Sequence, residues 1–361
     1  MGRYIPRNSL NILLPLLFVS AFGASILLTV DRGLFFTQIG FIFICVIAFF
    51  LISSIDTAVL EWISPFSYVL GCLLLAVTYL GPTIRGVTRW IIIAGVQLQP
   101  SELVKPFLLL GFSHFIVKYP PRTLKNIALQ VFLFLIPLFL VFRQPDLGSS
   151  IIYVFLWTAM MIAGGLPLWV LASSIFLLVL GAPFGWHILA GYQKLRIITF
   201  FAPTLEPLGA GYNAIQSTIA VGSGQLFGKG LGLGTQSHFR FLPEFHTDFI
   251  FATLVEEFGF VGGALLLVSY AYLGFVIIRP FLFQRTYPPQ FFLYSMGLLT
   301  MLVVQVGINC GMNMGMVPIT GITLPLVSYG GSSLVGLISS FGLLSSFERA
   351  SQKNTEIEMP V

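Results

Sequence analysis

Long apolar runs dominate this chain, and polar residues are confined to the breaks between them. A helix that crosses a bilayer needs about 20 mostly apolar residues. Only 9% of the 361 residues are charged, against about 25% in soluble domains, which excludes a soluble globular protein. We predict an all-α polytopic integral membrane protein, one domain over 1–361, with about ten transmembrane helices. The runs lie at 9–30, 34–54, 62–81, 101–118, 127–143, 147–164, 166–186, 248–278, 290–310 and 325–346.

The distribution of basic residues predicts that the N-terminus is inside. With that orientation the short inner loops carry Lys and Arg, as the positive-inside rule requires. Arg85, Arg89 and Arg143 then fall on the outer side and need a functional reason to be there. The net charge of +5 comes from scattered residues, which favours an anionic lipid or phosphate partner over nucleic acid.

A large extracellular loop, 187–247, separates the seventh and eighth runs. Its length and its Gly, Gln and aromatic content predict an ordered segment, with a short helix over 215–221 along the membrane surface. A short cytoplasmic tail, 347–361, follows the last run, and its polar part from Ser351 is expected to be disordered.

Ionisable residues at the ends of membrane spans are costly and mark candidate functional sites. Glu102 and Lys105 are three residues apart, so they can pair on one helical face. They form either a structural pair, with Trp90 as an interfacial aromatic, or part of an outer polar pocket. Arg143 and Asp146 either neutralise each other or contribute to the same pocket.

Asp248 stands where the large loop enters the eighth apolar run. A carboxylate at that boundary can act as a general base, or it can simply cap the helix. Glu244 and His246 precede it closely, but no metal-binding spacing surrounds His246.

Two glycine-rich segments have special backbone requirements. The first, 222–234, lacks the Walker A pattern because Ser223 and Gly230 stand at its defining positions. It is either a phosphate-binding loop that uses backbone amides and Lys229, or a flexible hinge. The second, 311–333, contains Pro318, Pro325 and several glycines, and predicts a broken, re-entrant backbone. Glu256 and Glu257 are expected to face helices or a polar cavity rather than lipid.

Eight motifs, in this order, resemble the SEDS family of peptidoglycan glycosyltransferases over residues 10–346. They are GVTRW, QPSELVK, QPDLGSS, GYQKLR, GSGQLFGKGLGLGTQ, FLPEFHTDFIF, EEFGFVGG and PITGITLPLVSYGGSS. The short N-terminal tail and the sequence of the QPDLGSS motif favour the rod-shape (RodA) branch of the family over the division (FtsW) branch.

The resemblance implies polymerisation of lipid II into glycan strands on the outer face of the cytoplasmic membrane during cell elongation. It makes Asp248 the general base of an inverting transfer, with undecaprenyl diphosphate as the leaving group. Four basic residues match family positions suited to the diphosphate: Arg89, Lys105, Arg196 and Lys229. Seven further positions match motif residues that contact substrate or shape the cavity: Trp90, Glu102, Asp146, Gln216, Glu244, His246 and Ser328.

No cofactor is evident, and a divalent cation, Mg²⁺ or Mn²⁺, is left open. The resemblance also implies a class B penicillin-binding protein, a transpeptidase, as partner. Three alternatives remain: an FtsW-type division polymerase, a lipid II flippase or transporter, for which broken helices are also typical, and a non-catalytic scaffold.

Overall fold

The protein is almost entirely helical in the computed structural model, which describes residues 7–81, 88–93, 96–189, 191–205, 209, 211–283 and 287–358. The long helices are α1 (Arg7–Val30), α2 (Arg32–Ser53), α3 (Thr57–Val77), α5 (Lys105–Lys118), α6 (Leu124–Phe142), α7 (Leu147–Ala163), α8 (Leu168–Ile188), α12 (Ile250–Phe283), α13 (Pro289–Asn313) and α14 (Gly331–Glu358). The short elements are η1 (Thr78–Leu80), β1 (Ile91–Ile93), β2 (Val96–Leu98), α4 (Pro100–Leu103), α9 (Gly191–Phe201), η2 (Pro203–Leu205), α10 (Tyr212–Ser223) and α11 (Thr235–His238).

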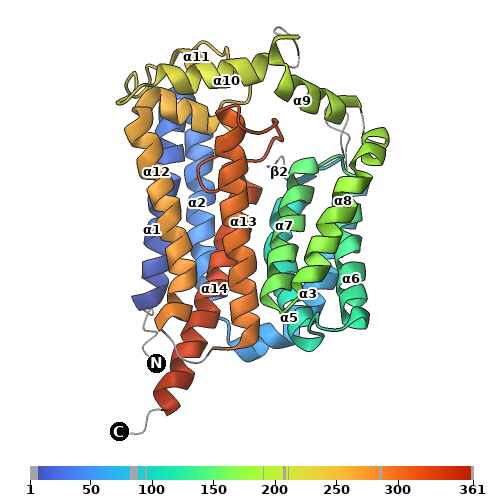
Figure 1. The fold of residues 1–361 in the computed structure, drawn as a ribbon. Helices are drawn as coiled ribbons and strands as arrows, with labels where there is room; N and C mark the ends of the chain where they lie inside the picture. Colours follow the sequence, from blue (N-terminus) through green and yellow to red (C-terminus); the bar gives the residue numbers. More distant parts are fainter. Residues whose placement is uncertain are drawn as a thin grey trace.

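The long helices stand roughly parallel in two groups (Figure 1). One group holds α1, α2, α12, α13 and α14, and the other holds α3, α5, α6, α7 and α8. The two groups meet where α13 packs against α5 and α7. At one end of the bundle, α9, α10 and α11 lie across the helix axes, and the described C-terminal residues lie at the other end.

Each predicted apolar run contains helix, and the chain carries membrane-spanning helices. Among the described residues, seven helices are long and apolar enough to cross a membrane, and α7 is a shorter apolar helix. Ten crossings remain a prediction. The run at 101–118 is divided into α4 and α5 at Val104, and α14 begins only at Gly331. The helix expected over 215–221 is present as α10 and is longer than predicted; its location along the membrane surface remains a prediction.

One local prediction was wrong, and one secondary-structure element was missed. The polar residues from Ser351 were expected to be disordered, but helix α14 continues through them to Glu358. The antiparallel hairpin of β1 and β2, which pairs Ile91 with Leu98, was not predicted. Its signal was a run of three isoleucines, because β-branched residues favour strands.

Helix α12 is interrupted at Gly259, which has φ +70° and ψ −169°. The interruption frees backbone groups, and the glycine-rich segment after α10 provides partners for them. Phe260 N–H donates to the Gln225 carbonyl at 2.8 Å, and Val261 N–H donates to the Leu226 carbonyl at 3.1 Å. In the opposite direction, the Lys229 amide donates to the Glu256 carbonyl at 2.9 Å. The segment is therefore fixed to α12 and is not a flexible hinge.

The predicted broken backbone is present between α13 and α14. Residues 314–330 form turns and irregular structure, and the segment folds back beside α13 (Figure 1). Gly315, Gly321 and Leu326 adopt positive φ angles of 71°, 74° and 68°. The side-chain amide of Asn309 donates to the Ile322 carbonyl at 2.7 Å. A side chain of α13 thus forms a hydrogen bond with a carbonyl that lies outside any helix, as an apolar environment requires.

Replacing Gly228 with Ala should destabilise the protein, because this glycine combines φ +79° with a position where a Cβ atom would lie 2.1 Å from the Glu257 carbonyl oxygen. Strain and overpacking of this kind cost at least about 2 kcal/mol. Gly222→Ala is the matched control, because a Cβ there meets open space in helix α10. Thermal unfolding in detergent should show a lower midpoint for Gly228→Ala and an unchanged or higher one for Gly222→Ala. Equal midpoints would contradict the docking of this segment on α12.

Candidate active site

Asp248 lies two residues before α12, and its backbone is fixed by two side chains of α13. The Asn309 and Asn313 amides donate to its carbonyl at 3.0 and 3.1 Å. Its carboxylate, in contrast, makes no hydrogen bond with the described residues, so it does not cap α12. A Cβ atom on Gly321 would lie 3.2 Å from Asp248 Oδ2, which places the broken 314–330 segment directly beside the carboxylate.

The surroundings of Asp248 raise its pKa to about 6, chiefly through burial. The negative charge of Glu244 acts in the same direction, whereas the guanidinium groups of Arg89 and Arg196 lower the pKa. A carboxylate with a pKa near 6 is mostly ionised at neutral pH and is a stronger base than an ordinary aspartate. The geometry thus supports the general-base hypothesis over helix capping.

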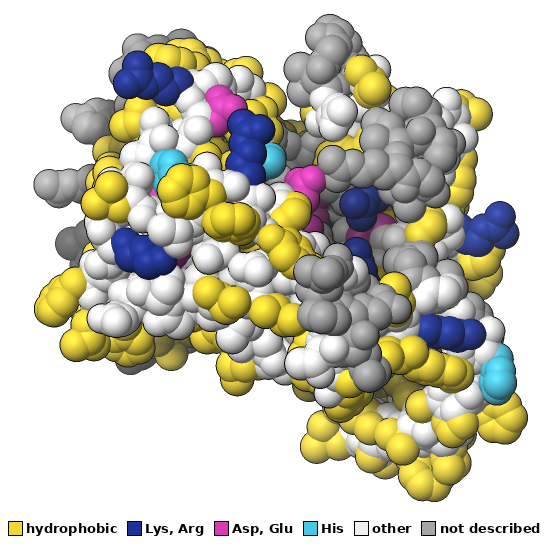
Figure 2. Space-filling model, turned by 90° about the horizontal axis from the view of Figure 1, so that it is seen from above, with side chains coloured by type: hydrophobic (Ala, Val, Ile, Leu, Met, Phe, Trp, Pro, Cys, Tyr) yellow, Lys and Arg dark blue, Asp and Glu magenta, His cyan; other side chains and the backbone are white. Residues whose placement is uncertain are grey.

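Two of the four predicted basic residues act on Asp248 from different parts of the chain. Arg89 precedes β1, and its Nε atom is buried without a hydrogen-bond partner among the described residues. Its guanidinium carbon lies 5.8 Å from the centre of the Trp90 ring. Arg196, on α9, donates to the Thr320 carbonyl at 3.0 Å. Seen from the α10 end, acidic and basic side chains lie close together in a depression of the surface (Figure 2).

The residues that precede Asp248 form a tight turn with a defined backbone. Glu244 has φ +54°, and its carboxylate accepts a hydrogen bond from the Thr247 hydroxyl at 3.1 Å. Ser328 donates to the Thr247 carbonyl at 2.6 Å and accepts from the Leu324 amide at 2.8 Å. Ser328 therefore joins this turn to the broken segment.

His246 lies between this turn and the start of α14. Its carbonyl accepts from the Tyr329 amide at 2.8 Å, and its ring centre lies 5.9 Å from that of Tyr329. Burial lowers the pKa of His246, which favours the neutral form of the imidazole. Its Nδ1 atom is buried with no hydrogen-bond partner among the described residues.

A second polar cluster surrounds Asp146, which is buried and caps α7. Its carboxylate accepts from the Ser149 amide and hydroxyl at 3.1 and 2.8 Å, from the Ser101 hydroxyl at 3.0 Å and from the Gln99 amide group at 2.9 Å. Arg143 makes no described ion pair with it and lies 5.9 Å from the Phe139 ring instead. Mutual neutralisation of Arg143 and Asp146, one of the two alternatives from the sequence, is therefore wrong.

The predicted pairing of Glu102 with Lys105 is confirmed, with an N–O distance of 2.6 Å between two buried side chains. Lys105 is thus already neutralised within the protein. Arg85 lies outside the described residues. Gln216 is half-buried on α10, and no described contact links it to Asp248.

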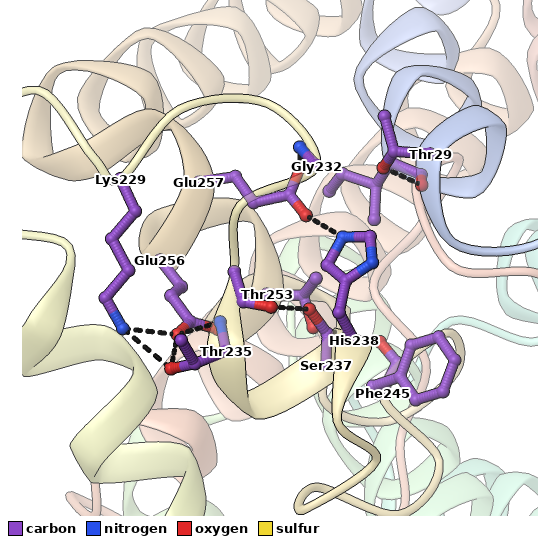
Figure 3. Close-up of polar contacts among 12 residues, drawn as sticks. Thr29, Lys229, Gly232, Thr235, Ser237, His238, Phe245, Thr253, Glu256 and Glu257 are labelled. Atoms are coloured by element: carbon purple, nitrogen blue, oxygen red, sulfur yellow. Dashed lines mark hydrogen bonds and ion pairs between the residues drawn. The ribbon is translucent and has the colours of Figure 1, made fainter.

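Lys229 belongs to a separate hydrogen-bond network that surrounds two glutamates of α12 (Figure 3). Its ammonium group lies 2.7 Å from Glu256 Oε1 and donates to the Thr235 hydroxyl at 2.9 Å. The fully buried Glu256 carboxylate also accepts from the Thr235 amide at 2.8 Å. Glu257, equally buried, accepts from the Gly232 amide at 3.1 Å and lies 3.2 Å from His238 Nε2.

Both glutamates therefore face protein rather than lipid, as predicted. The Lys229 charge and the amides of this segment are used within the protein, so the structure does not bring Lys229 to Asp248 as a phosphate ligand.

Sequence reasoning missed the two asparagines that hold Asp248. Asn309 and Asn313 are four residues apart in an apolar helix, and this spacing puts them on one face. Polar residues at such a spacing inside a membrane span were the available signal. The described residues contain no group of three or more His, Cys, Asp or Glu side chains that could hold a metal ion.

Lys229→Met should destabilise the protein by about 1–3 kcal/mol, because it leaves a buried carboxylate without its cation. The double variant Lys229→Met/Glu256→Gln should recover much of that loss, since the uncompensated charge is gone. Thermal unfolding of the four species in a double-mutant cycle measures the coupling. Additive losses would show that Lys229 does not stabilise Glu256.

Comparison with known proteins places these features in a family. A family model described as a cell cycle protein, FtsW/RodA/SpoVE, matches residues 7–353. The peptidoglycan glycosyltransferase MrdB of Escherichia coli strain K12 is 38% identical over 346 residues, which cover 95% of this chain and 93% of that protein. MrdB of Helicobacter pylori strain J99 is 33% identical over 342 residues, covering 92% of this chain and 87% of that protein.

Two solved structures share the fold. One belongs to a peptidoglycan synthase complex described as coordinating polymerization and crosslinking; a chain in it matches with a TM-score of 0.80 and 28% identity, covering 94% of this chain and 97% of that chain. The rod shape determining protein RodA of Thermus thermophilus matches with a TM-score of 0.71 and 28% identity, covering 94% of this chain and 96% of that chain. These similarities confirm the resemblance drawn from the eight motifs: the chain belongs to the FtsW/RodA/SpoVE family.

Proposed function

We propose that this protein is a peptidoglycan glycosyltransferase that polymerises lipid II into glycan strands on the outer face of the cytoplasmic membrane during cell elongation. The E. coli and H. pylori relatives, both named peptidoglycan glycosyltransferases, support this activity. The observation that carries the proposal for this chain is the Asp248 carboxylate, which lacks a hydrogen bond to any described residue, has a pKa raised to about 6 and is acted on electrostatically by Glu244 and two guanidinium groups.

In the proposed mechanism Asp248 is the general base. It takes the proton from the 4-hydroxyl of the acceptor GlcNAc while that oxygen attacks the anomeric carbon of the donor MurNAc. The bond between that carbon and the diphosphate breaks, and the electron pair leaves with undecaprenyl diphosphate. One base and no covalent intermediate convert the α-linked donor into a β-linked product. The fixed backbone of Asp248 supports this role, because general-base catalysis depends on geometry.

Arg89 and Arg196 are the proposed cations for the diphosphate. Charge develops on the leaving group in the transition state, and preplaced cations stabilise it there. Both residues already act electrostatically on Asp248, so a diphosphate bound between them would lie close to the base. Trp90, Gln216 and His246 stay proposed substrate contacts.

The other predicted residues are proposed to stabilise the site through their contacts with neighbouring residues. Glu102, Lys105, Asp146 and Ser328 are proposed to hold the shape of the cavity, and Lys229 to hold the outer segment on α12. The described contacts of each residue support this division, because their charges and hydrogen-bonding groups already have protein partners.

The proposed topology has ten transmembrane helices, with Asp248 and α9 to α11 outside. A class B penicillin-binding protein is the proposed partner that crosslinks the new strand. The structural similarity to a chain of a complex that coordinates polymerization and crosslinking supports it.

The decisive experiment incubates the purified protein, alone and with its cognate class B penicillin-binding protein, with labelled lipid II in liposomes. Wild type should produce glycan ladders, and Asp248→Asn should lose them by at least about a hundredfold, since general-base catalysis contributes about 10²–10⁴. Asp56→Asn is the matched control: this exposed carboxylate lies near Arg349 on α14, and its loss should leave the ladders unchanged.

Asp248→Asn should also remain folded, because it removes a charge that burial disfavours. No ladder from wild type with its partner would overturn the proposal. The same liposomes would then be tested for transfer of lipid II across the bilayer, the transporter alternative.

The pH dependence of polymerisation provides a separate test. A base with a pKa near 6 predicts that kcat/KM falls as the pH drops through about 6. Because the Glu244 charge raises this pKa, Glu244→Gln should move the acid limb to lower pH. Arg89 lowers the pKa, so Arg89→Gln should move the limb to higher pH, whatever its effect on the maximal rate. Profiles that do not shift in opposite directions would contradict the assignment of the limb to Asp248.

A further inference from the structure

A small cavity of about 170 Å³ lies at the end of the bundle away from Asp248. It is formed where α1, α12 and α14 meet. Its lining includes Asn11 and Ile12 from α1, Tyr272, Val276 and Arg279 from α12, and Glu348 from α14.

Glu348 is the unusual member of this lining. Its exposed fraction is only 8%, yet no hydrogen bond or ion pair to its carboxylate is formed by the side chains that the structure describes. Every other described carboxylate with an exposed fraction as low as that of Glu348 has donors: Glu102, Asp146, Glu256 and Glu257. A buried carboxylate without a partner is strongly disfavoured, so this cavity suits a ligand that supplies a hydrogen-bond donor to Glu348.

The cavity also presents an opposite charge. Arg279 is close enough to Glu348 to act on it electrostatically, but the two form no ion pair. The site therefore offers one anion and one cation that are held apart, with the polar side chain of Asn11 beside them. A ligand that carries a cation and an anion a few bonds apart would satisfy both groups at once.

The cavity borders exposed side chains of α12. Tyr272 and Phe275 line it and are 51% and 44% exposed on a membrane-spanning helix. A ligand whose apolar part extends along this helix face would place its polar end in the cavity. This arrangement matches a phospholipid of the leaflet on that side.

We propose that this cavity binds the headgroup of an aminophospholipid of the phosphatidylethanolamine type. The primary ammonium donates to the Glu348 carboxylate, and the phosphate binds the Arg279 guanidinium, which suits phosphate oxygens. Phosphatidylglycerol has no cation for Glu348, and the quaternary ammonium of phosphatidylcholine has no N–H to donate. At about 30 Å³ per water molecule, the cavity of about 170 Å³ has room for about six waters, a volume in the range of an ethanolamine phosphate.

The test uses the full chain in lipid nanodiscs of phosphatidylglycerol alone, or with an equal fraction of phosphatidylethanolamine or phosphatidylcholine. Wild type should unfold at a higher temperature with phosphatidylethanolamine than with either other composition. Native mass spectrometry should show preferential retention of phosphatidylethanolamine. Glu348→Gln should lower that preference about tenfold, which corresponds to the loss of one charge-assisted hydrogen bond.

Two further variants make the result decisive. Glu61→Gln removes an exposed carboxylate on α3 and should keep the preference. Arg279→Gln should weaken retention of phosphatidylethanolamine through the phosphate. Glu348→Gln should fold at least as well as wild type in phosphatidylglycerol alone, because it buries no charge. Equal retention by wild type and Glu348→Gln, or no lipid preference in wild type, would overturn the proposal and assign the cavity to water or a hydrated cation.

Discussion

Backbone polar groups inside an apolar bundle need partners within the protein, and this requirement organises the structure around Asp248. Three interruptions of helical backbone occur in the described chain: at Gly259 in α12, between α13 and α14, and between α4 and α5. Each is stabilised by a segment from elsewhere. The segment after α10 pairs with the interrupted turn of α12, Asn309 holds the 314–330 segment, and Tyr153 donates to the Ser101 carbonyl at 2.7 Å. The interruptions are ordered because backbone groups that have no partner within a helix form hydrogen bonds with other parts of the protein.

This principle separates structural carboxylates from reactive ones. Asp146, Glu256 and Glu257 are surrounded by donors, so their carboxylate oxygens are held in hydrogen bonds within the protein. Asp248 has charged neighbours but no described donor to its carboxylate, and its pKa is raised accordingly. The protein thus binds these three acids with internal donors and leaves the Asp248 carboxylate without a described donor, under the electrostatic influence of two arginines. Stability is given up locally where reactivity is needed.

The sequence predicted the helical membrane class, the broken backbone near Pro318 and Pro325, and the local pair of Glu102 with Lys105. These features depend on composition or on residues close in sequence. It did not predict that Lys229 pairs with Glu256 rather than approaching Asp248, because that choice depends on how the segment after α10 docks on α12. The contacts of Asp146 with Gln99 and Ser101 were missed for the same reason, since they join residues more than 40 positions apart. Side-chain partners across helices are set by packing, which periodicity does not encode.

The ion pairs also bear on how the chain enters the membrane during synthesis. Lys229 precedes Glu256 by 27 positions and His238 precedes Glu257 by 19, so both partners leave the ribosome before α12 does. Lys105 follows Glu102 by only three positions, and the two can pass into the bilayer as a neutral unit. Each of these buried acids therefore reaches the apolar phase with its counterpart already synthesised or within one helical turn.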